Sequence, residues 1–124
     1  MKTKSILISV VDDDESVRES LPDLLREFGF AARTFSSAEE FLASDCVAQT
    51  SCLVLDIGLP GMSGIDLQKE LTNRPPEIPI VFVTARGDEE DRYRLIRQGA
   101  VECLFKPFSD SALLDALNTA LHRN

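Results

Sequence analysis

Polar side chains that are capable of chemistry follow four separate apolar runs of this chain. The residues, each given with its run, are Asp12 and Asp13 after residues 6–11, Asp56 after 52–55, Thr84 after 78–83 and Lys106 after 101–105. An apolar run without polar alternation is typical of a parallel strand that is buried on both faces. The carboxyl ends of such strands meet at one edge of an open α/β sheet, where ligands bind. We therefore expect these five side chains to form one site.

The chemistry of this predicted site follows from its charges. Carboxylates that converge repel one another, so they stay ionised only where a cation or a basic side chain compensates them. Oxygen ligands suit Mg²⁺ rather than zinc. A metal ion, the Lys106 ammonium and the Thr84 hydroxyl around one carboxylate would stabilise a phosphoryl group on it. Asp56 is the better nucleophile, because the acidic pair is placed to hold the metal.

Each of these residues also has an ordinary structural explanation. Acidic residues after a first strand can cap the next helix, Asp56 can turn the chain, Thr84 can satisfy a loop, and Lys106 with Pro107 can form a turn. All of these explanations would have to hold at the same sheet edge. The coincidence favours a divalent-metal phosphoryl site.

Composition excludes several classes of protein. The 124 residues are 44% hydrophobic and 27% charged, which predicts one domain with a core of its own. The net charge of -8 argues against direct nucleic-acid binding, since phosphate neutralisation needs clustered basic residues. The longest apolar runs are too short to span a membrane. We therefore expect a cytoplasmic protein.

The cysteines support the same location. They are odd in number and include no C-x-x-C pair: Cys46, Cys52 and Cys103. This pattern contains neither a disulfide framework nor a zinc site, and it favours small buried side chains in a reducing cytosol.

The predicted elements alternate along the chain. The strands are expected at residues 6–11, 31–35, 52–56, 78–84 and 101–105, and the helices at 15–28, from 36 to about 43 or 48, at 63–71, at 88–98 and from 109 onward. Pro22 predicts a kink in the first helix, or a helix that becomes regular only after it, and Gly29 is expected to close that helix. Such alternation with right-handed crossovers predicts an α/β fold with a doubly wound, five-stranded parallel sheet.

At this point the chain resembles the receiver domain of two-component response regulators, over essentially all of residues 1–124. The matching motifs, in order, are Val11-Asp12-Asp13, Asp56-x-x-x-Pro60-x-Met62-x-Gly64, Thr84-Ala85 and Lys106-Pro107-Phe108. The sequence is most similar to the nitrogen-fixation regulator (FixJ-type) subgroup, whose members often join a receiver to a helix-turn-helix domain. The resemblance implies a flavodoxin-like (CheY-like) sheet with strand order 2-1-3-4-5 and five helices.

The resemblance also implies a role for each site residue. Asp56 would accept a phosphoryl group from a phosphohistidine on a sensor histidine kinase, with Thr84 and Lys106 on the phosphoryl oxygens. Mg²⁺ would be bound by Asp13, Asp56 and the Gly58 carbonyl, with Asp12 helping through water. The reaction would be phosphotransfer to the chain itself, followed by slow hydrolysis, rather than turnover by an enzyme. The output would be phosphorelay signal transduction, with transcription regulated through an attached or partner effector.

One residue departs from the family pattern. Cys103 lies at the switch position, three residues before Lys106, where the family usually has Tyr or Phe. Phe105 is expected on the same strand face, by the strand period of two. Arg86, two residues after Thr84, is expected to influence how water reaches the acyl phosphate.

The output surface is expected at residues 88–98, 101–105 and from 109 onward. The acidic start and the arginines of the first segment suit either the charged patch of a phosphorylation-dependent homodimer or a solvated helix face with internal ion pairs.

Three other functions remain open at the level of sequence. A Mg²⁺-dependent phosphatase with Asp56 as nucleophile would want a general acid two residues later, where Gly58 stands. A pseudo-receiver, used only for interaction, would lack a metal carboxylate or the lysine. A flavodoxin would need a phosphate-binding loop after the first strand, where three aspartates would repel an anion.

Overall fold

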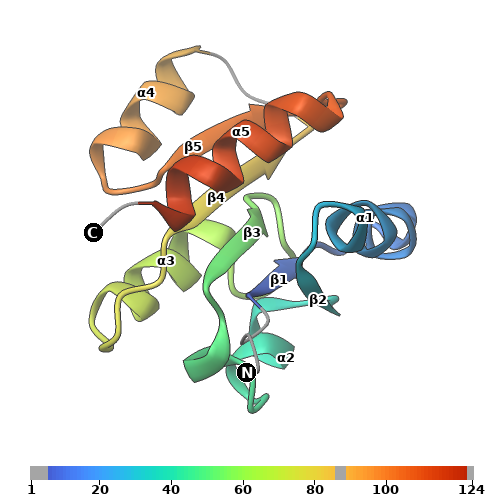
Figure 1. Ribbon diagram of the computed structural model, residues 1–124. Helices are drawn as coiled ribbons and strands as arrows, with labels where there is room; N and C mark the ends of the chain where they lie inside the picture. The colour runs from blue at the N-terminus through green and yellow to red at the C-terminus, as the bar shows by residue number, and fades with distance from the viewer. Residues whose placement is uncertain (1–5, 86–88, 123–124) are drawn as a thin grey trace.

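The computed structural model describes residues 6–85 and 89–122. Five parallel strands form one sheet in the order β2-β1-β3-β4-β5, with helices on both sides (Figure 1). The strands are β1 (Leu7–Val11), β2 (Ala31–Phe35), β3 (Cys52–Asp56), β4 (Ile80–Thr84) and β5 (Glu102–Phe105). The helices are α1 (Glu15–Glu27), α2 (Ala38–Leu42), α3 (Gly64–Thr72), α4 (Glu89–Arg97) and α5 (Asp110–Leu121). The predicted doubly wound, flavodoxin-like architecture is confirmed.

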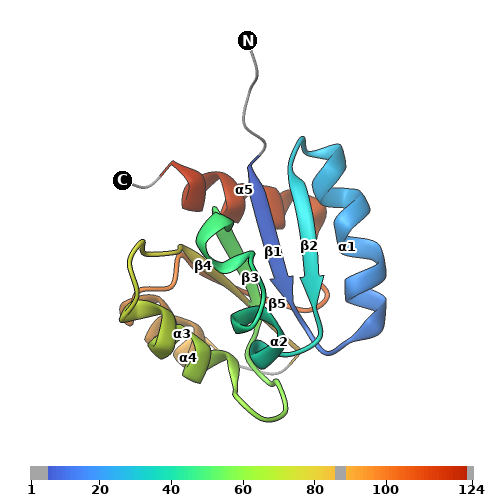
Figure 2. The ribbon, with the colours of Figure 1, turned by 90° about the horizontal axis from the view of Figure 1, so that it is seen from below.

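The helices divide between the two faces of the sheet. Helices α1 and α5 cover one face, and α2, α3 and α4 cover the other (Figure 2). Every residue of β3 and β4 is buried, as the unbroken apolar runs predict for strands that are covered on both sides. None of the helices in the described part of the chain combines the length and apolar character that crossing a bilayer requires.

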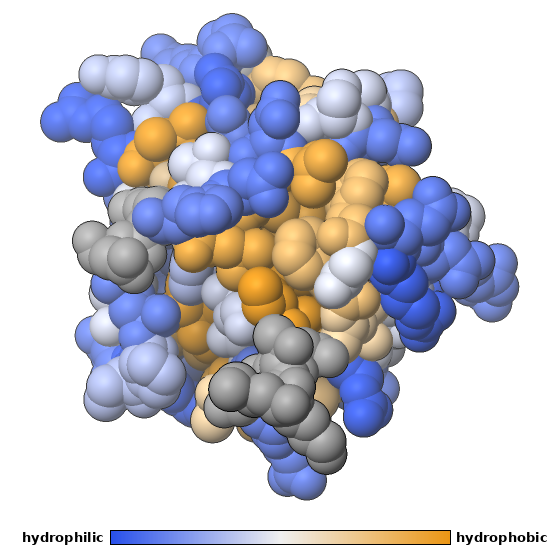
Figure 3. Space-filling view, viewed as in Figure 1, coloured by the Kyte–Doolittle hydropathy of each residue, from blue (hydrophilic) through white to orange (hydrophobic). Residues whose placement is uncertain are grey.

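Helices α1 and α5 leave part of their apolar core within reach of solvent. Figure 3 shows apolar side chains at the surface between these two helices. Leu24, Phe28 and Leu121 pack against this core but are only half-buried. Part of the core between α1 and α5 is therefore open to solvent.

The sheet register brings the ends of the strands together. Val11 pairs with Leu55, and Asp56 pairs with Val83 on the neighbouring strand. The residues that follow β1 and β5 and those that end β3 and β4 thus lie along one edge. This is the edge at which the sequence predicts the site.

Helix α1 differs from one expectation and confirms another. It begins at Glu15, capped by the Asp14 side chain, and runs through Pro22, so the expectation of a helix that becomes regular only after Pro22 was wrong. Gly29 closes the helix at φ +96°, where its N–H donates to the Arg26 carbonyl. A proline removes one backbone donor, and in α1 the continuous turns on both sides tolerate that loss.

Three other boundaries are tighter than predicted. Strand β1 omits Ile6, which is 40% exposed, and β4 starts at Ile80 because Pro79 has no N–H to offer the ladder. Helix α2 ends at Leu42, and a separate 3₁₀ turn, η1, spans Val47–Gln49. The Ser44 hydroxyl donates to the Phe41 carbonyl and accepts the Cys46 N–H, and such local hydrogen bonds compete with continuation of the helix.

Candidate functional site

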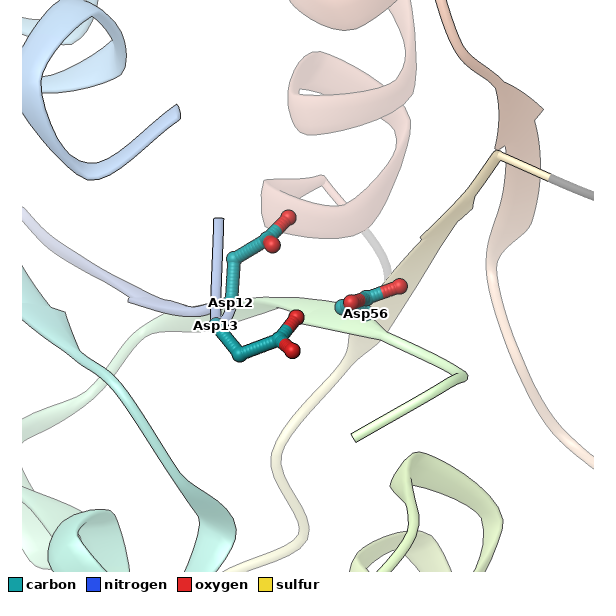
Figure 4. A group of neighbouring side chains, drawn as sticks. All are labelled: Asp12, Asp13 and Asp56. Atoms are coloured by element: carbon teal, nitrogen blue, oxygen red, sulfur yellow. The ribbon is translucent and has the colours of Figure 1, made fainter. Parts of the chain in front are cut away.

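Three carboxylates converge at the predicted sheet edge. One oxygen from each of Asp12, Asp13 and Asp56 lies within 4.8 Å of the others. Figure 4 shows the first two at the end of β1, facing Asp56 at the end of β3. Within the described residues this donor set consists of oxygens alone, which fits a hard divalent cation such as Mg²⁺.

Asp12 is the most firmly held of the three carboxylates, and it is fully buried. Its Oδ1 accepts the Asp14 N–H at 2.9 Å, and its Oδ2 accepts from Lys106 Nζ at 2.9 Å. The Arg18 guanidinium, at the end of the first turn of α1, donates to the Asp12 backbone carbonyl at 2.9 Å. Both carboxylate oxygens of Asp12 are therefore already engaged.

Lys106 enters the site from the end of β5, and its peptide bond to Pro107 is cis. Desolvation lowers its pKa, but the hydrogen bond to Asp12 and the negative charges of Asp12 and Asp56 outweigh this, so that the pKa rises above its usual value. The lysine is therefore a fixed positive charge at neutral pH. It is the counter-charge that keeps a buried carboxylate ionised beside it.

Asp56 occupies a different environment. Only 7% of the residue is exposed, and its Oδ1 accepts the Gly58 N–H over a long distance of 3.4 Å. Desolvation first, and then the negative charge of Asp12, raise its pKa from 3.8 to about 6, against the opposing effect of Lys106. Asp56 is thus a carboxylate whose charge the fold leaves incompletely compensated.

The remaining predicted residues surround this group. Asp13 is exposed, whereas Thr84 is buried and lies one residue beyond the partner of Asp56 in the sheet. The Lys106 N–H donates to the Thr84 carbonyl at 2.8 Å, which fixes the ends of β4 and β5 relative to each other. Gly58 follows Asp56 on the exposed loop before α3.

Cys103 is buried on β5, among core residues that include Phe82 and Leu95. Desolvation raises its pKa to about 11. Its N–H donates to the Glu102 carboxylate at 2.9 Å, and Arg92 of α4 pairs with that carboxylate at 2.8 Å. The predicted switch position is thus next to a polar link between α4 and the edge strand.

Helix α4 was expected to carry either a charged homodimer patch or a solvated face with internal ion pairs, and it does contain such ion pairs. Arg94 pairs with Asp91 at 2.8 Å, and Arg92 pairs with Glu89 at 3.2 Å. Arg86 and Asp88 lie outside the described residues, so their expected roles stay predictions.

Sequence reasoning missed two residues around this site, whereas Asp14 caps α1 as expected of the acidic residues after the first strand. Arg18 supports the Asp12 carbonyl from the first turn of α1. Helical spacing after the acidic motif is the signal that could have found Arg18. Glu39 of α2 accepts the Met62 N–H at 2.9 Å, and no local pattern predicts this contact between distant segments.

A groove of about 740 Å³ adjoins the site. It runs along α1 past the loop after β5, and its lining includes Val17, Leu24, Lys106 and Phe108. Four acidic residues also line it: Asp14, Asp23, Glu27 and Asp110. The groove therefore combines an apolar floor with an acidic rim, and it opens beside the acidic site.

Comparison with known proteins gives the same picture. The family model of the response regulator receiver domain matches residues 8–118. Nodulation protein W of Bradyrhizobium diazoefficiens is 48% identical over 122 residues, which are 98% of this chain and 53% of that protein. Transcriptional regulatory protein FixJ of Azorhizobium caulinodans is 36% identical over 121 residues, 98% of this chain and 57% of that protein. The chain spans about half the length of these curated relatives.

Solved structures agree with the sequence relatives. The response regulator StyR superposes with a TM-score of 0.85 at 50% identity, over 95% of this chain and 60% of that one. The crystal structure of FixJ-N gives 0.84 at 33% identity, over 98% of each chain. The chain belongs to the receiver domains of two-component response regulators, the proteins of phosphorelay signalling.

Proposed function

We propose that Asp56 is the phosphoryl acceptor of this receiver, within a site formed by Asp12, Asp13, Gly58, Thr84 and Lys106. One observation carries the proposal: three carboxylates lie within 4.8 Å of one another, and one lysine is already committed to Asp12. Such a group needs a further cation, and a cation beside a carboxylate is what phosphoryl transfer to that carboxylate requires.

Asp56 is a better acceptor than Asp12 because of its surroundings. Both oxygens of Asp12 are held, and the residue is fully buried. Asp56 accepts the Gly58 N–H over a long distance of 3.4 Å and retains some exposure. Asp13 is exposed and suits a metal ligand that also meets solvent.

The proposed transfer exchanges a P–N bond for a P–O bond. An Asp56 carboxylate oxygen attacks the phosphorus of a phosphohistidine, the P–N bond breaks, and the imidazole leaves with a proton from solvent. Lys106 and Thr84 then stabilise the phosphoryl oxygens, because both end on the same sheet edge as Asp56. In the later hydrolysis, water attacks phosphorus, which releases inorganic phosphate and restores the carboxylate.

Mg²⁺ is the proposed cofactor, with Asp13, Asp56 and the Gly58 carbonyl as ligands and Asp12 acting through water. When bound, it neutralises charge on the transferring group. Asp12 meanwhile keeps Lys106 at the site, since the two are 2.9 Å apart.

The proposed partner is a sensor histidine kinase that docks over the groove between α1 and the loop after β5. The groove opens at Lys106, so a donor seated there is delivered to the site. Its acidic rim favours a partner with basic residues around an apolar ridge, because opposite charges steer association.

The proposed output is a change at α4 and β5 that controls transcription through an attached or partner effector, with a phosphorylation-dependent homodimer as one form. Cys103 stands where the family usually has the aromatic ring of Tyr or Phe, so we expect a smaller side-chain movement at this switch position on phosphorylation. Phosphorylation can only bias two existing states. If Cys103→Tyr leaves the phosphorylated dimerisation constant and the amide spectrum unchanged, Cys103 has no role in the switch.

A hydrolase is the second candidate, since the same aspartate could act on small phosphate esters. Position 58 is glycine, so the general acid that turnover wants is missing at that position. We therefore propose a switch that transfers one group to itself and does not turn over.

The test is intact mass spectrometry after incubation with acetyl phosphate and Mg²⁺. We expect the wild type to gain one phosphoryl group that hydroxylamine removes, as an acyl phosphate should. Asp56→Asn and a metal-free sample should gain nothing. Asp45→Asn, a change of an exposed carboxylate, should behave as the wild type.

A gain that persists in Asp56→Asn would refute the assignment of the acceptor. If the wild type gains nothing from acetyl phosphate, beryllofluoride with Mg²⁺ is added as a mimic of the phosphoryl group. Failure to bind it would leave a pseudo-receiver as the better description.

A further inference from the structure

We infer that Glu39, on the short helix α2, is a positioning residue for the loop that follows Asp56 and carries Gly58. The inference rests on the proposed function, since this loop supplies a proposed metal ligand. Glu39 acts on the site through the backbone of the loop, where it accepts the Met62 N–H.

The contact joins two distant parts of the chain. Glu39 Oε2 accepts the Met62 backbone N–H at 2.9 Å. The same hydrogen bond lowers the pKa of Glu39, so the carboxylate is the form that the loop stabilises. A charged acceptor makes a stronger bond to an N–H than a neutral one does.

Gly61 shows that the loop is fitted closely to this carboxylate. It has φ +74°, a conformation that favours glycine. A Cβ built at Gly61 would lie 2.7 Å from Glu39 Oε2, so a side chain there would push the carboxylate aside. The loop backbone therefore passes directly against Glu39.

The base of the loop is closed at Asp56 itself. The Gly64 N–H donates to the Ile57 carbonyl at 3.1 Å. A Cβ at Gly64 would overlap the Asp56 backbone oxygen and lie 2.9 Å from Ile57 Cα. The loop is thus fixed at its base by Gly64 and from outside by Glu39, with Gly58 between the two.

This arrangement matters because Gly58 contributes backbone atoms to the site. Its N–H already donates to Asp56 Oδ1 at 3.4 Å, and its carbonyl is a proposed Mg²⁺ ligand. Mg²⁺ demands near-ideal octahedral geometry, so small displacements of a ligand matter. Loss of the Glu39 contact should widen the range of loop positions and weaken metal binding without removing a ligand.

The test compares Glu39→Ala with Glu39→Gln, which keeps an acceptor oxygen. Hydrogen exchange of the Met62 and Gly58 amides is followed in metal-free protein, and Mg²⁺ affinity is measured by calorimetry. For Glu39→Ala we expect faster exchange at both amides and Mg²⁺ binding weaker by about three- to tenfold, the factor that one hydrogen bond of ordinary net strength accounts for. Glu39→Gln should recover most of both properties.

Asp45→Ala is the matched control, because it removes an exposed carboxylate near the end of α2. It should change neither exchange nor affinity. Unchanged exchange in Glu39→Ala overturns the inference, whatever the metal does. If exchange rises while the Mg²⁺ affinity stays equal to that of the wild type, Glu39 orders the loop but does not position a ligand, and the inference also fails. If the wild type binds no Mg²⁺, the proposed metal site is refuted, and with it the proposed role of Glu39 in positioning a metal ligand.

Discussion

Replacing Asp56 by asparagine should make the metal-free chain more stable at neutral pH. Asp56 is almost fully buried beside Asp12, and Lys106 compensates the pair only in part. Asparagine has nearly the same shape and keeps an oxygen that can accept the Gly58 N–H. The substitution therefore removes a poorly compensated charge and little else. The expectation is unusual, since most substitutions of buried residues destabilise proteins.

The magnitude follows from the pKa of Asp56. Its rise from 3.8 to about 6 corresponds to about 3 kcal/mol of destabilisation by the ionised form, at about 1.4 kcal/mol per pKa unit. Relaxation of the neighbouring carboxylates reduces this figure. We expect Asp56→Asn to raise the free energy of unfolding by about 1 to 3 kcal/mol at pH 7.5.

The same pKa shift also predicts how the effect depends on pH. Because the folded pKa lies above the unfolded one, the native chain binds more protons than the unfolded chain between pH 3.8 and about 6. The wild type therefore loses this stability as pH rises through that window, and Asp56→Asn does not. The difference between the two proteins should be close to zero below pH 4 and complete by about pH 7.

The assay is urea denaturation of both proteins in EDTA, at a series of pH values. Asp115→Asn, which changes an exposed carboxylate on α5, serves as the control and should follow the wild type. Mg²⁺ should then stabilise the wild type more than Asp56→Asn, because binding to the native state alone adds to its stability. An Asp56→Asn protein that is no more stable at pH 7.5, or a difference that does not vary with pH, would refute this electrostatic reasoning.

Three further outcomes are expected. Lys106→Met leaves the buried Asp12 carboxylate without its counter-charge and should lower the free energy of unfolding by about 2 to 4 kcal/mol in urea titrations; a loss no larger than that of a surface lysine would contradict the pairing. Gly64→Ala forces a methyl group against backbone and should cost at least about 2 kcal/mol, visible as a lower Tm, whereas an unchanged Tm would show that the loop can shift. With a thiol reagent at pH 8, half-buried Cys46 should react first, because burial raises the pKa of Cys52 to about 12 and that of Cys103 to about 11; rapid labelling of Cys52 or Cys103 in the native protein would contradict this burial.

The fold was predictable because its signals are local. Unbroken apolar runs mark strands that are covered on both faces, and the helix between each pair requires a parallel, right-handed crossover. Ser63 and Ser109, at the start of two predicted helices, cap α3 and α5, and Gly29 closes α1 as predicted. The boundaries were less predictable, since a single side chain such as Ser44 can end a helix by hydrogen-bonding the backbone.

From the sequence alone, acidic, hydroxyl and ammonium groups had to share one edge of the sheet, because the ends of parallel strands must meet there. The folded structure sets how those groups are paired. It buries Asp12 against Lys106, leaves Asp13 exposed, and makes Asp56 the under-compensated charge. It also joins Glu39 to Met62. Such pairings depend on strand register and on the distance between packed elements, and the local periodicity of the chain determines neither.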